Sequence, residues 1–146
     1  MNEERVLELM IDQTDRQIIN LLKQNARMQW QEIGEYVHLT GQAVKNRIVR
    51  LEKLGVIEGY TVRVNTNKLG MEITAFVTVF MKTTAHTAFQ EHLKKSALIE
   101  ESHRISGEGC YLLKLHVPNQ QALIVFLDEI LQYGNYKVNL SIGQIK

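Results

Sequence analysis

The chain has 146 residues, a formal net charge of +1 and one cysteine, and 45% of its residues are apolar. This composition predicts a soluble globular protein of one or two domains, and the single cysteine excludes an intrachain disulfide. No apolar run reaches the roughly 18 residues of a membrane span and the N-terminal stretch is acidic, so we expect neither a span nor a secretory signal, but a cytoplasmic protein.

Two short helices are predicted in the first third of the chain. Asp12 can cap the first, which carries an apolar face and should end near Asn25. The second should span residues 30–37, and we interpret Trp30 at its start as core or domain-interface packing rather than a base-stacking residue. Residues 1–11 precede both helices as an arm, either a packed or dimerising helix or a frayed tail.

A third helix is predicted over residues 39–54. Thr40 can cap its start, and Val44, Ile48 and Leu51 recur at steps of four and three on the face that would be buried. Four basic side chains and one acidic side chain lie between Thr40 and Leu54, whereas residues 1–64 as a whole carry nine basic and nine acidic side chains. A DNA-binding surface would therefore come from local clustering, the alternative being a mildly basic amphipathic helix with no ligand.

The three helices together predict a helix-turn-helix, with the third as the reading helix. Amides and cations on that helix suit base edges and phosphates. We expect Gln42, Lys45 and Asn46 to read bases, and Arg47 and Arg50 to contact phosphates or a guanine. The full set of candidate DNA-binding residues is Thr40, Gln42, Ala43, Lys45, Asn46, Arg47, Arg50 and Arg63.

Gly55 should end the third helix, because glycine commonly follows a helix C-terminus. Residues 56–64 are rich in β-branched side chains, which predicts a strand and wing in which Arg63 could touch a phosphate. Residues 1–64 would then form a winged helix-turn-helix domain. Residues 65–70 are turn-rich and form the expected linker, and residues 71–146 the second domain.

The second domain alternates between strand and helix patterns. Strands are predicted over residues 73–81, 100–106, 110–117 and 136–145, with helices over residues 84–97 and 119–132 and a tight turn at Gly107–Gly109. This β-α-β-β-α-β order is that of a ferredoxin-like αβ-sandwich, so the fold class is α+β. The first and third strands read as apolar on both faces, and since helices cover only one face, we expect subunits to associate through the other.

The sequence gives little support for metal binding, cofactor binding or catalysis. The five histidines are not spaced as tetrahedral metal ligands, and neither a phosphate loop nor a nucleotide fingerprint is present, so we expect no metal and no cofactor. Cys110 is more typical of inert packing than of a nucleophile. A small enzyme on the second domain lacks an acid–base pair, and we expect a protein that is not an enzyme.

Both halves of the chain resemble the leucine-responsive/asparagine regulator (Lrp/AsnC) family of transcriptional regulators, from about residue 11 to residue 146. The order and spacing of many short matches carry the resemblance. In the first half the matches are Ile11, Asp12, Asp15, Ile18, Ile19, Asn20, Leu21, Leu22, Asn25, Ala26, Arg27, Glu32, Ile33, Gly34, Val44, Arg47, Ile48, Arg50, Leu51, Glu52, Gly55, Val56, Ile57, Gly59, Tyr60, Leu69 and Gly70. In the second half the match is the glycine-containing turn of residues 106–113.

The resemblance implies a sequence-specific regulator of double-stranded DNA that forms dimers, commonly assembled into octamers, with an amino-acid effector bound between dimers by a RAM-type domain. By position, the effector cleft would use Gly107, Gly109, Cys110, Tyr111, Asn139 and Ser141. The family often has an acidic residue where Cys110 stands and threonines near Asn139 and Ser141, so the effector could differ or be absent. Three alternatives remain open: a hairpin with no ligand, an amino-acid-sensing oligomer that does not bind DNA, and a DNA-organising protein with little sequence specificity.

Overall fold

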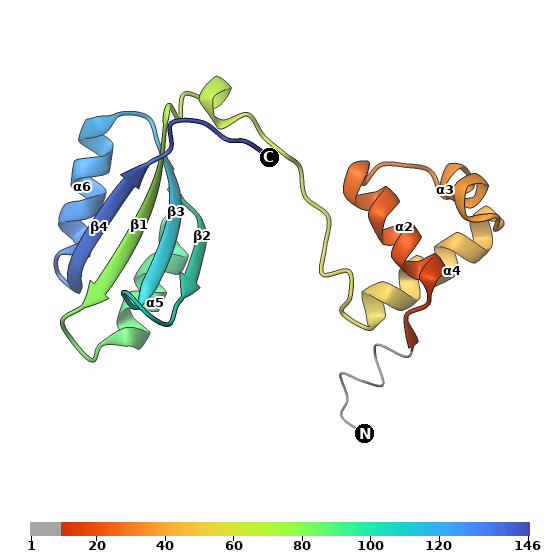
Figure 1. The fold of residues 1–146 in the computed structure, drawn as a ribbon, viewed down its shortest axis with the longest axis horizontal. Helices are drawn as coiled ribbons and strands as arrows, with labels where there is room; N and C mark the ends of the chain where they lie inside the picture. Colours follow the sequence, from red (N-terminus) through yellow and green to blue (C-terminus); the bar gives the residue numbers. More distant parts are fainter. Residues whose placement is uncertain (1–9) are drawn as a thin grey trace. The chain divides into compact units, whose positions relative to one another are not determined.

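The computed structural model describes residues 10–146, which divide into two compact units, with the boundary in the chain between Arg63 and Val64 (Figure 1). The arm expected over residues 1–11 lies outside the described residues except for its last two positions. Over the described part of the chain, no helix has both the length and the apolar character needed to cross a membrane.

The first unit is a three-helix bundle of α2 (Gln13–Gln24), α3 (Trp30–Val37) and α4 (Gly41–Lys53) (Figure 1). Its core is small and aliphatic, and it draws on all three helices. The residues buried in it are Ile18, Ile33, Val44, Ile48 and Leu51. The helix starts follow local capping, because the Asp12 carboxylate accepts the Asp15 N–H at 2.8 Å and the Thr40 hydroxyl accepts the Ala43 N–H at 3.2 Å.

The turn between α3 and α4 is tight for two reasons. His38 caps α3 in the left-handed region, with φ 56° and ψ 43°. Gly34 lies so close to the Leu39 carbonyl that a Cβ at this position would collide with it. These two residues set the short connection of the predicted helix-turn-helix, which is confirmed.

The strand and wing predicted over residues 56–64 do not form. Val56 and Ile57 bend back at the end of α4, where both N–H groups donate to the Leu51 carbonyl. Residues 58–64 form neither helix nor strand, and Val62 among them is 78% exposed. The prediction was wrong because β-branched composition favours an extended backbone, whereas a strand also needs a neighbour for its hydrogen bonds. A short 3₁₀ helix, η1 (Thr66–Leu69), follows within the expected linker.

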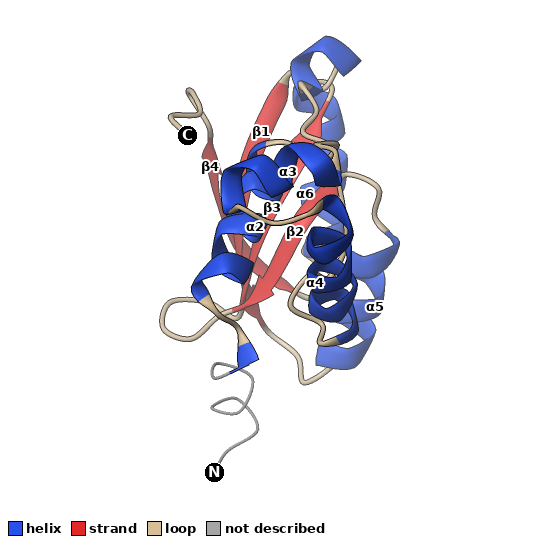
Figure 2. Cartoon of the chain, turned by 90° about the vertical axis from the view of Figure 1, so that its right-hand side faces the viewer, coloured by secondary structure: helices blue, strands red, loops and turns tan. Residues whose placement is uncertain are grey.

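The second unit is a four-stranded antiparallel sheet of order β2-β3-β1-β4. Its strands are β1 (Ile73–Met81), β2 (Ile99–Arg104), β3 (Tyr111–Val117) and β4 (Gly134–Leu140). Helices α5 (His86–Lys95) and α6 (Gln120–Ile130) both lie on one face of this sheet (Figure 2). The α+β ferredoxin-like fold is confirmed. The last strand is displaced from its predicted position, because Gly134, which resembles a turn residue, pairs with Met81.

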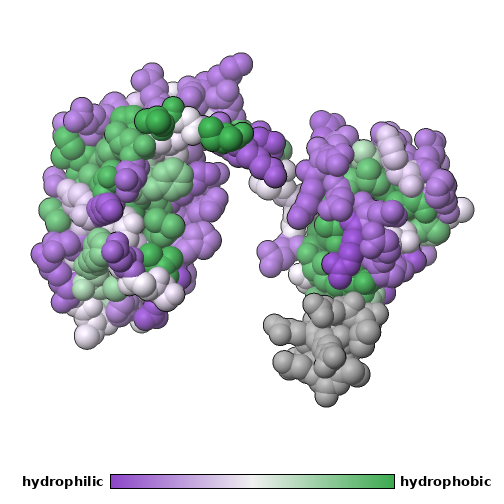
Figure 3. All heavy atoms as spheres, in the orientation of Figure 1, coloured by the Kyte–Doolittle hydropathy of each residue, from purple (hydrophilic) through white to green (hydrophobic). Residues whose placement is uncertain are grey.

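One face of the sheet is buried and the other is open. Phe89 and Leu93 of α5, and Phe126 and Ile130 of α6, pack against the covered face. The open face carries Phe76, Phe80 and Leu112, which are 36–38% exposed, and Figure 3 shows apolar residues gathered over this sheet. The prediction that the third strand is apolar on both faces was wrong. Its open face carries Lys114 and His116 beside Leu112.

Candidate functional site

Helix α4 presents amide side chains away from the bundle. Gln42 and Asn46 are both exposed, and the Gln42 Nε2 donates to the Asn46 Oδ1 at 3.0 Å. This bond orders two predicted base readers on one face. Thr40 uses its hydroxyl to cap the helix, and Ala43 is half-buried.

Arg47 and Arg50, in contrast, are tied to the start of α2. Arg47 Nη1 contacts Asp12 Oδ2 at 2.8 Å and Asp15 Oδ1 at 2.9 Å. Arg50 Nη2 contacts Asp15 Oδ2 at 2.5 Å, and its Nη1 donates to the Met10 carbonyl at 3.0 Å. Asp15 is fully buried, and a buried charge is costly unless it is paired. The two guanidinium groups provide that pairing and thereby hold α4 against α2.

The two carboxylates of this cluster also bond to the backbone. Asp12 and Asp15 form a capping box, in which each side chain accepts the other residue's N–H. The Asp15 N–H and the Arg47 side chain lower the pKa of Asp12, while Asp12 and Asp15 raise the pKa of Arg47. Asp15 therefore serves the start of one helix and the docking of another. Its role was missed because carboxylates near a helix start are commonly explained by the helix dipole alone.

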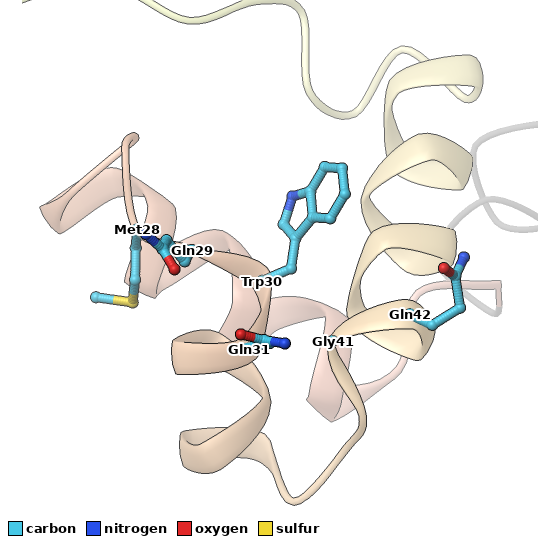
Figure 4. A pocket seen from close by; sticks show the side chains of 6 residues that line it. All are labelled: Met28, Gln29, Trp30, Gln31, Gly41 and Gln42. Atoms are coloured by element: carbon cyan, nitrogen blue, oxygen red, sulfur yellow. The ribbon is translucent and has the colours of Figure 1, made fainter.

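A pocket of about 630 Å³ opens where the starts of α3 and α4 meet. Figure 4 shows its lining, which consists of Met28, Gln29, Trp30, Gln31, Gly41 and Gln42. The core role predicted for Trp30 was wrong, because Trp30 is 46% exposed and lies outside the buried cluster, while the domain-interface alternative stays a prediction. The Lys45 ammonium lies 5.2 Å from the centre of its ring. Arg63 is exposed in the extended segment after α4.

The predicted effector hairpin connects β2 to β3 and depends on two glycines. Gly107 and Gly109 have φ angles of 95° and 89°. A Cβ at Gly109 would lie 2.5 Å from Thr78 Cγ2, which ties the hairpin closely to β1. The Cys110 N–H donates to the Val79 carbonyl at 2.7 Å, extending the β1–β3 ladder by one bond. The hairpin is therefore held by its backbone.

Tyr111 faces away from the open side of the sheet. It is 2% exposed and packs edge-on against Phe89 with 5.0 Å between ring centres. Its hydroxyl accepts a bond from Gln90 Nε2 at 3.0 Å and lies 2.9 Å from His86 Nδ1. The Tyr111 side chain thus belongs to the core beside α5, and only its backbone borders the hairpin.

The hairpin and the last strand of the same chain are far apart. Cys110 bonds to Val79, whereas Asn139 pairs opposite Phe76 and the Ser141 N–H donates to the Thr74 carbonyl at 2.9 Å. These contacts are three to five residues apart along β1, which at roughly 3.3 Å per residue is about 10–17 Å. One chain therefore does not bring the two halves of the predicted effector cleft together.

A polar network on the open face joins β2, β3 and β1. His116 Nδ1 lies 2.9 Å from Thr74 Oγ1, and its Nε2 lies 2.7 Å from Glu100 Oε2. Lys114 Nζ contacts the same Glu100 oxygen at 2.8 Å. Lys114, and then His116, lower the pKa of Glu100, which in turn raises the pKa of Lys114. Alternation of Lys114 and His116 along one face of their strand is the sequence pattern that could have revealed this network.

Metal binding gains no support from the geometry. Within residues 10–146, no three His, Cys, Asp or Glu side chains converge as ligands for one metal ion. His116 and His103 each lie beside a glutamate on the open face.

Comparisons with known proteins cover both units. The AsnC-type helix-turn-helix domain matches residues 11–52, and the Lrp/AsnC ligand binding domain matches residues 74–146. The HTH-type transcriptional regulator LrpB of Bacillus subtilis (strain 168) is 46% identical over 138 residues, which are 94% of this chain and 93% of that protein.

Solved structures show the same fold. The structure of B. subtilis LrpC superposes with a TM-score of 0.88 at 29% identity, covering 92% of this chain and 96% of the other. The transcriptional regulator NMB0573 of Neisseria meningitidis, solved as a complex with L-Met, has a TM-score of 0.87 at 23% identity and covers 92% of each chain. The expectation of a regulator rather than an enzyme agrees with these relatives. The chain belongs to the Lrp/AsnC family of transcriptional regulators.

Proposed function

We propose that this regulator reads double-stranded DNA with α4, using Gln42 and Asn46 at base edges and Lys45 beside them. The division of polar side chains on α4 is the observation that carries the proposal. Its amides face outward and bond to each other, whereas its two arginines are paired with Asp12 and Asp15. A surface of amides with one cation suits reading in the major groove more than non-specific attraction to phosphate.

The reading chemistry follows from the amide groups. Asn and Gln side chains both donate and accept, and they pair bidentately with the N6 and N7 atoms of adenine. The bond between Gln42 and Asn46 limits their rotation before DNA arrives. Arg47 and Arg50, predicted as DNA contacts, we assign instead to holding α4 on α2. Such a regulator acts in the cytoplasm, where we expect this one.

A second copy of the chain, we infer, covers the open face of the sheet. Phe76, Phe80 and Leu112 provide the apolar area for such a contact. Because the hairpin at Gly107–Cys110 and residues Asn139 and Ser141 are separated within one chain, an effector cleft that uses both would combine different copies in a higher assembly. We expect such a cleft to take an amino acid, as NMB0573 binds L-Met.

Selection of duplexes from a random library, followed by anisotropy of a labelled duplex, tests the reading helix. Asn46→Ala should relax preference at one base position by roughly 1–3 kcal/mol, because one bidentate contact is lost. Lys53→Ala, an exposed change at the far end of the same helix, is the control and should leave the base preference unchanged. Unaltered preference in Asn46→Ala, or weak binding to every duplex at moderate salt, would refute α4 as a sequence reader.

Light scattering with a panel of free amino acids tests the effector. We expect one amino acid to change the mass of the assembly, and Asn139→Ala to abolish that response without altering DNA binding by the helix-turn-helix unit. A strictly monomeric protein would contradict the second copy on the open face. A ligand-independent assembly would contradict the effector cleft while leaving the DNA proposal intact.

A further inference from the structure

The Trp30 indole is not part of the buried core of the first unit. Trp30 starts α3, is 46% exposed, and lies outside the cluster formed by Ile18, Ile33, Val44 and Ile48. Exposing a large aromatic side chain leaves apolar area in water that burial would stabilise. A single exposed aromatic residue is common, so its neighbours decide whether this one has a role.

Lys45 is the neighbour that indicates a role for Trp30. Its ammonium lies 5.2 Å from the indole centre, within the range of a cation–π contact. In the described part of the chain Lys45 pairs with no carboxylate, unlike Arg47 and Arg50. The indole, which itself lines the pocket, therefore restrains a positive charge without neutralising it.

The pocket beside this pair suits an anion flanked by an apolar surface. Three of its lining residues carry amides, namely Gln29, Gln31 and Gln42, and none carries a carboxylate. Figure 4 shows Trp30 projecting between the start of α3 and the start of α4. Amide N–H groups and one ammonium complement a phosphate, while the indole face complements a sugar or a thymine methyl group.

The position of the pocket identifies which anion that would be. Gln42 belongs both to the pocket and to the outward face of α4, so the two surfaces are continuous. In helix-turn-helix proteins the helix before the reading helix crosses the DNA backbone, and α3 is that helix here. A duplex read by α4 would therefore bring its phosphodiester chain past Trp30.

We propose that Trp30 and Lys45 form a backbone clamp at this pocket, in which the indole packs on the DNA strand and holds the Lys45 ammonium against a phosphate. The clamp rests on the proposed function, because it needs a duplex on α4. It assigns Lys45 to phosphate contact and makes Trp30 a positioning residue for that contact. The base edges are left to Gln42 and Asn46.

Trp30 is the chain's single tryptophan, so its emission reports directly on the clamp. Titrating the full protein with its selected duplex should quench or blue-shift this emission and reduce quenching by acrylamide. The change should saturate together with the anisotropy of the labelled duplex. Saturating anisotropy with unchanged emission would overturn the clamp and leave the proposed function standing, whereas no anisotropy change would refute the proposed function itself. Emission that changes with protein concentration alone would place Trp30 between copies and also overturn the clamp.

Substitutions then show whether Trp30 acts by holding Lys45 in place or only through its own contact with DNA. Trp30→Leu should weaken binding on the order of fivefold and flatten the salt dependence by up to about one unit of slope, because Lys45 is no longer held. Trp30→Phe keeps an aromatic ring and should retain most of the binding affinity and most of the salt dependence. Lys45→Met should flatten the slope equally, and adding Trp30→Leu to it should not flatten it further.

Tyr36→Leu is the matched control. Tyr36 is an aromatic residue on the same helix, is 62% exposed, and does not line the pocket. Its substitution should leave both affinity and salt slope at wild-type values. If Trp30→Leu behaves like Tyr36→Leu, the clamp is wrong.

Discussion

The two units fix their candidate sites by different means. In the first unit, side-chain ion pairs from Asp15 to Arg47 and Arg50 set the pose of the reading helix. In the second, backbone geometry at Gly107 and Gly109 and one main-chain bond to Val79 set the hairpin. The first arrangement is complete within one chain, whereas the second leaves Asn139 and Ser141 remote. A single chain therefore holds all the residues of the proposed DNA site, whereas the proposed effector cleft would need residues from more than one copy.

Asp15→Ala is the strongest way to break the first arrangement. It removes the fully buried carboxylate that two arginines share and half of the capping box, and we expect the first unit to lose about 2–4 kcal/mol of unfolding free energy. Urea unfolding followed by Trp30 emission measures this, because Trp30 lies in α3.

Asp12→Ala is the matched control, since Asp12 contacts the same Arg47 but is exposed. It should cost only about 1 kcal/mol, mostly through the lost helix cap. Equal losses for Asp12→Ala and Asp15→Ala would show that burial of the carboxylate does not matter here.

Gly109→Ala tests the backbone arrangement of the second unit. Its φ of 89° and the crowding against Thr78 should together cost about 2 kcal/mol, because the new methyl group meets a packed strand. Gly107→Ala, at φ 95° with open space around it, should cost about 1 kcal/mol. Thermal unfolding of the second unit compares the two. A larger cost at Gly107 would mean that contact with β1 does not hold the hairpin.

The smallest expected effect concerns Glu100, a partly exposed carboxylate that, like Asp15, contacts two basic side chains. Lys114 and His116 lower the pKa of Glu100 below its ordinary 4.5, so the folded chain binds this proton less readily than the unfolded chain. The resulting stability is fully present above the unfolded pKa and is lost as pH falls through the folded value. Because the Glu100 side chain is 46% exposed, Glu100→Gln should flatten the pH dependence of stability below pH 5 by less than about 1 kcal/mol. An effect as large as that of Asp15→Ala would contradict the contrast between a buried and an exposed carboxylate.

Local patterns in the sequence predicted most of the fold. The bounds of α3, and the caps at Asp12 and Thr40, depend on neighbouring residues and were predicted correctly. Residues 56–64 were predicted as a strand because a missing partner strand leaves no trace in local composition. The failures therefore concern interactions between distant segments.

The candidate sites were harder to predict than the fold. Helical spacing put Arg47 and Arg50 on the polar side of α4 but could not show that Asp15, more than thirty residues earlier, would bind them. Tyr111 was predicted by position to contribute to the effector cleft, and the sequence did not reveal that the pairing register turns its side chain toward α5. Only the register of β1 with its neighbours reveals the distance between the hairpin and Asn139.

Asn46 and Arg47 are adjacent in sequence but lie under opposite evolutionary constraints. Asn46 is exposed, and its side chain bonds to Gln42 on the same helix, so exchanging it should cost little packing, whereas exchanging Arg47 alone would break its bonds to Asp12 and Asp15. On the proposed function, Gln42 and Asn46 can therefore be exchanged to change the operator sequence while the bundle stays intact. Because the ion pairs of Asp15 stabilise the bundle independently of Gln42 and Asn46, a change of target on the proposed function would not first need a gain in stability.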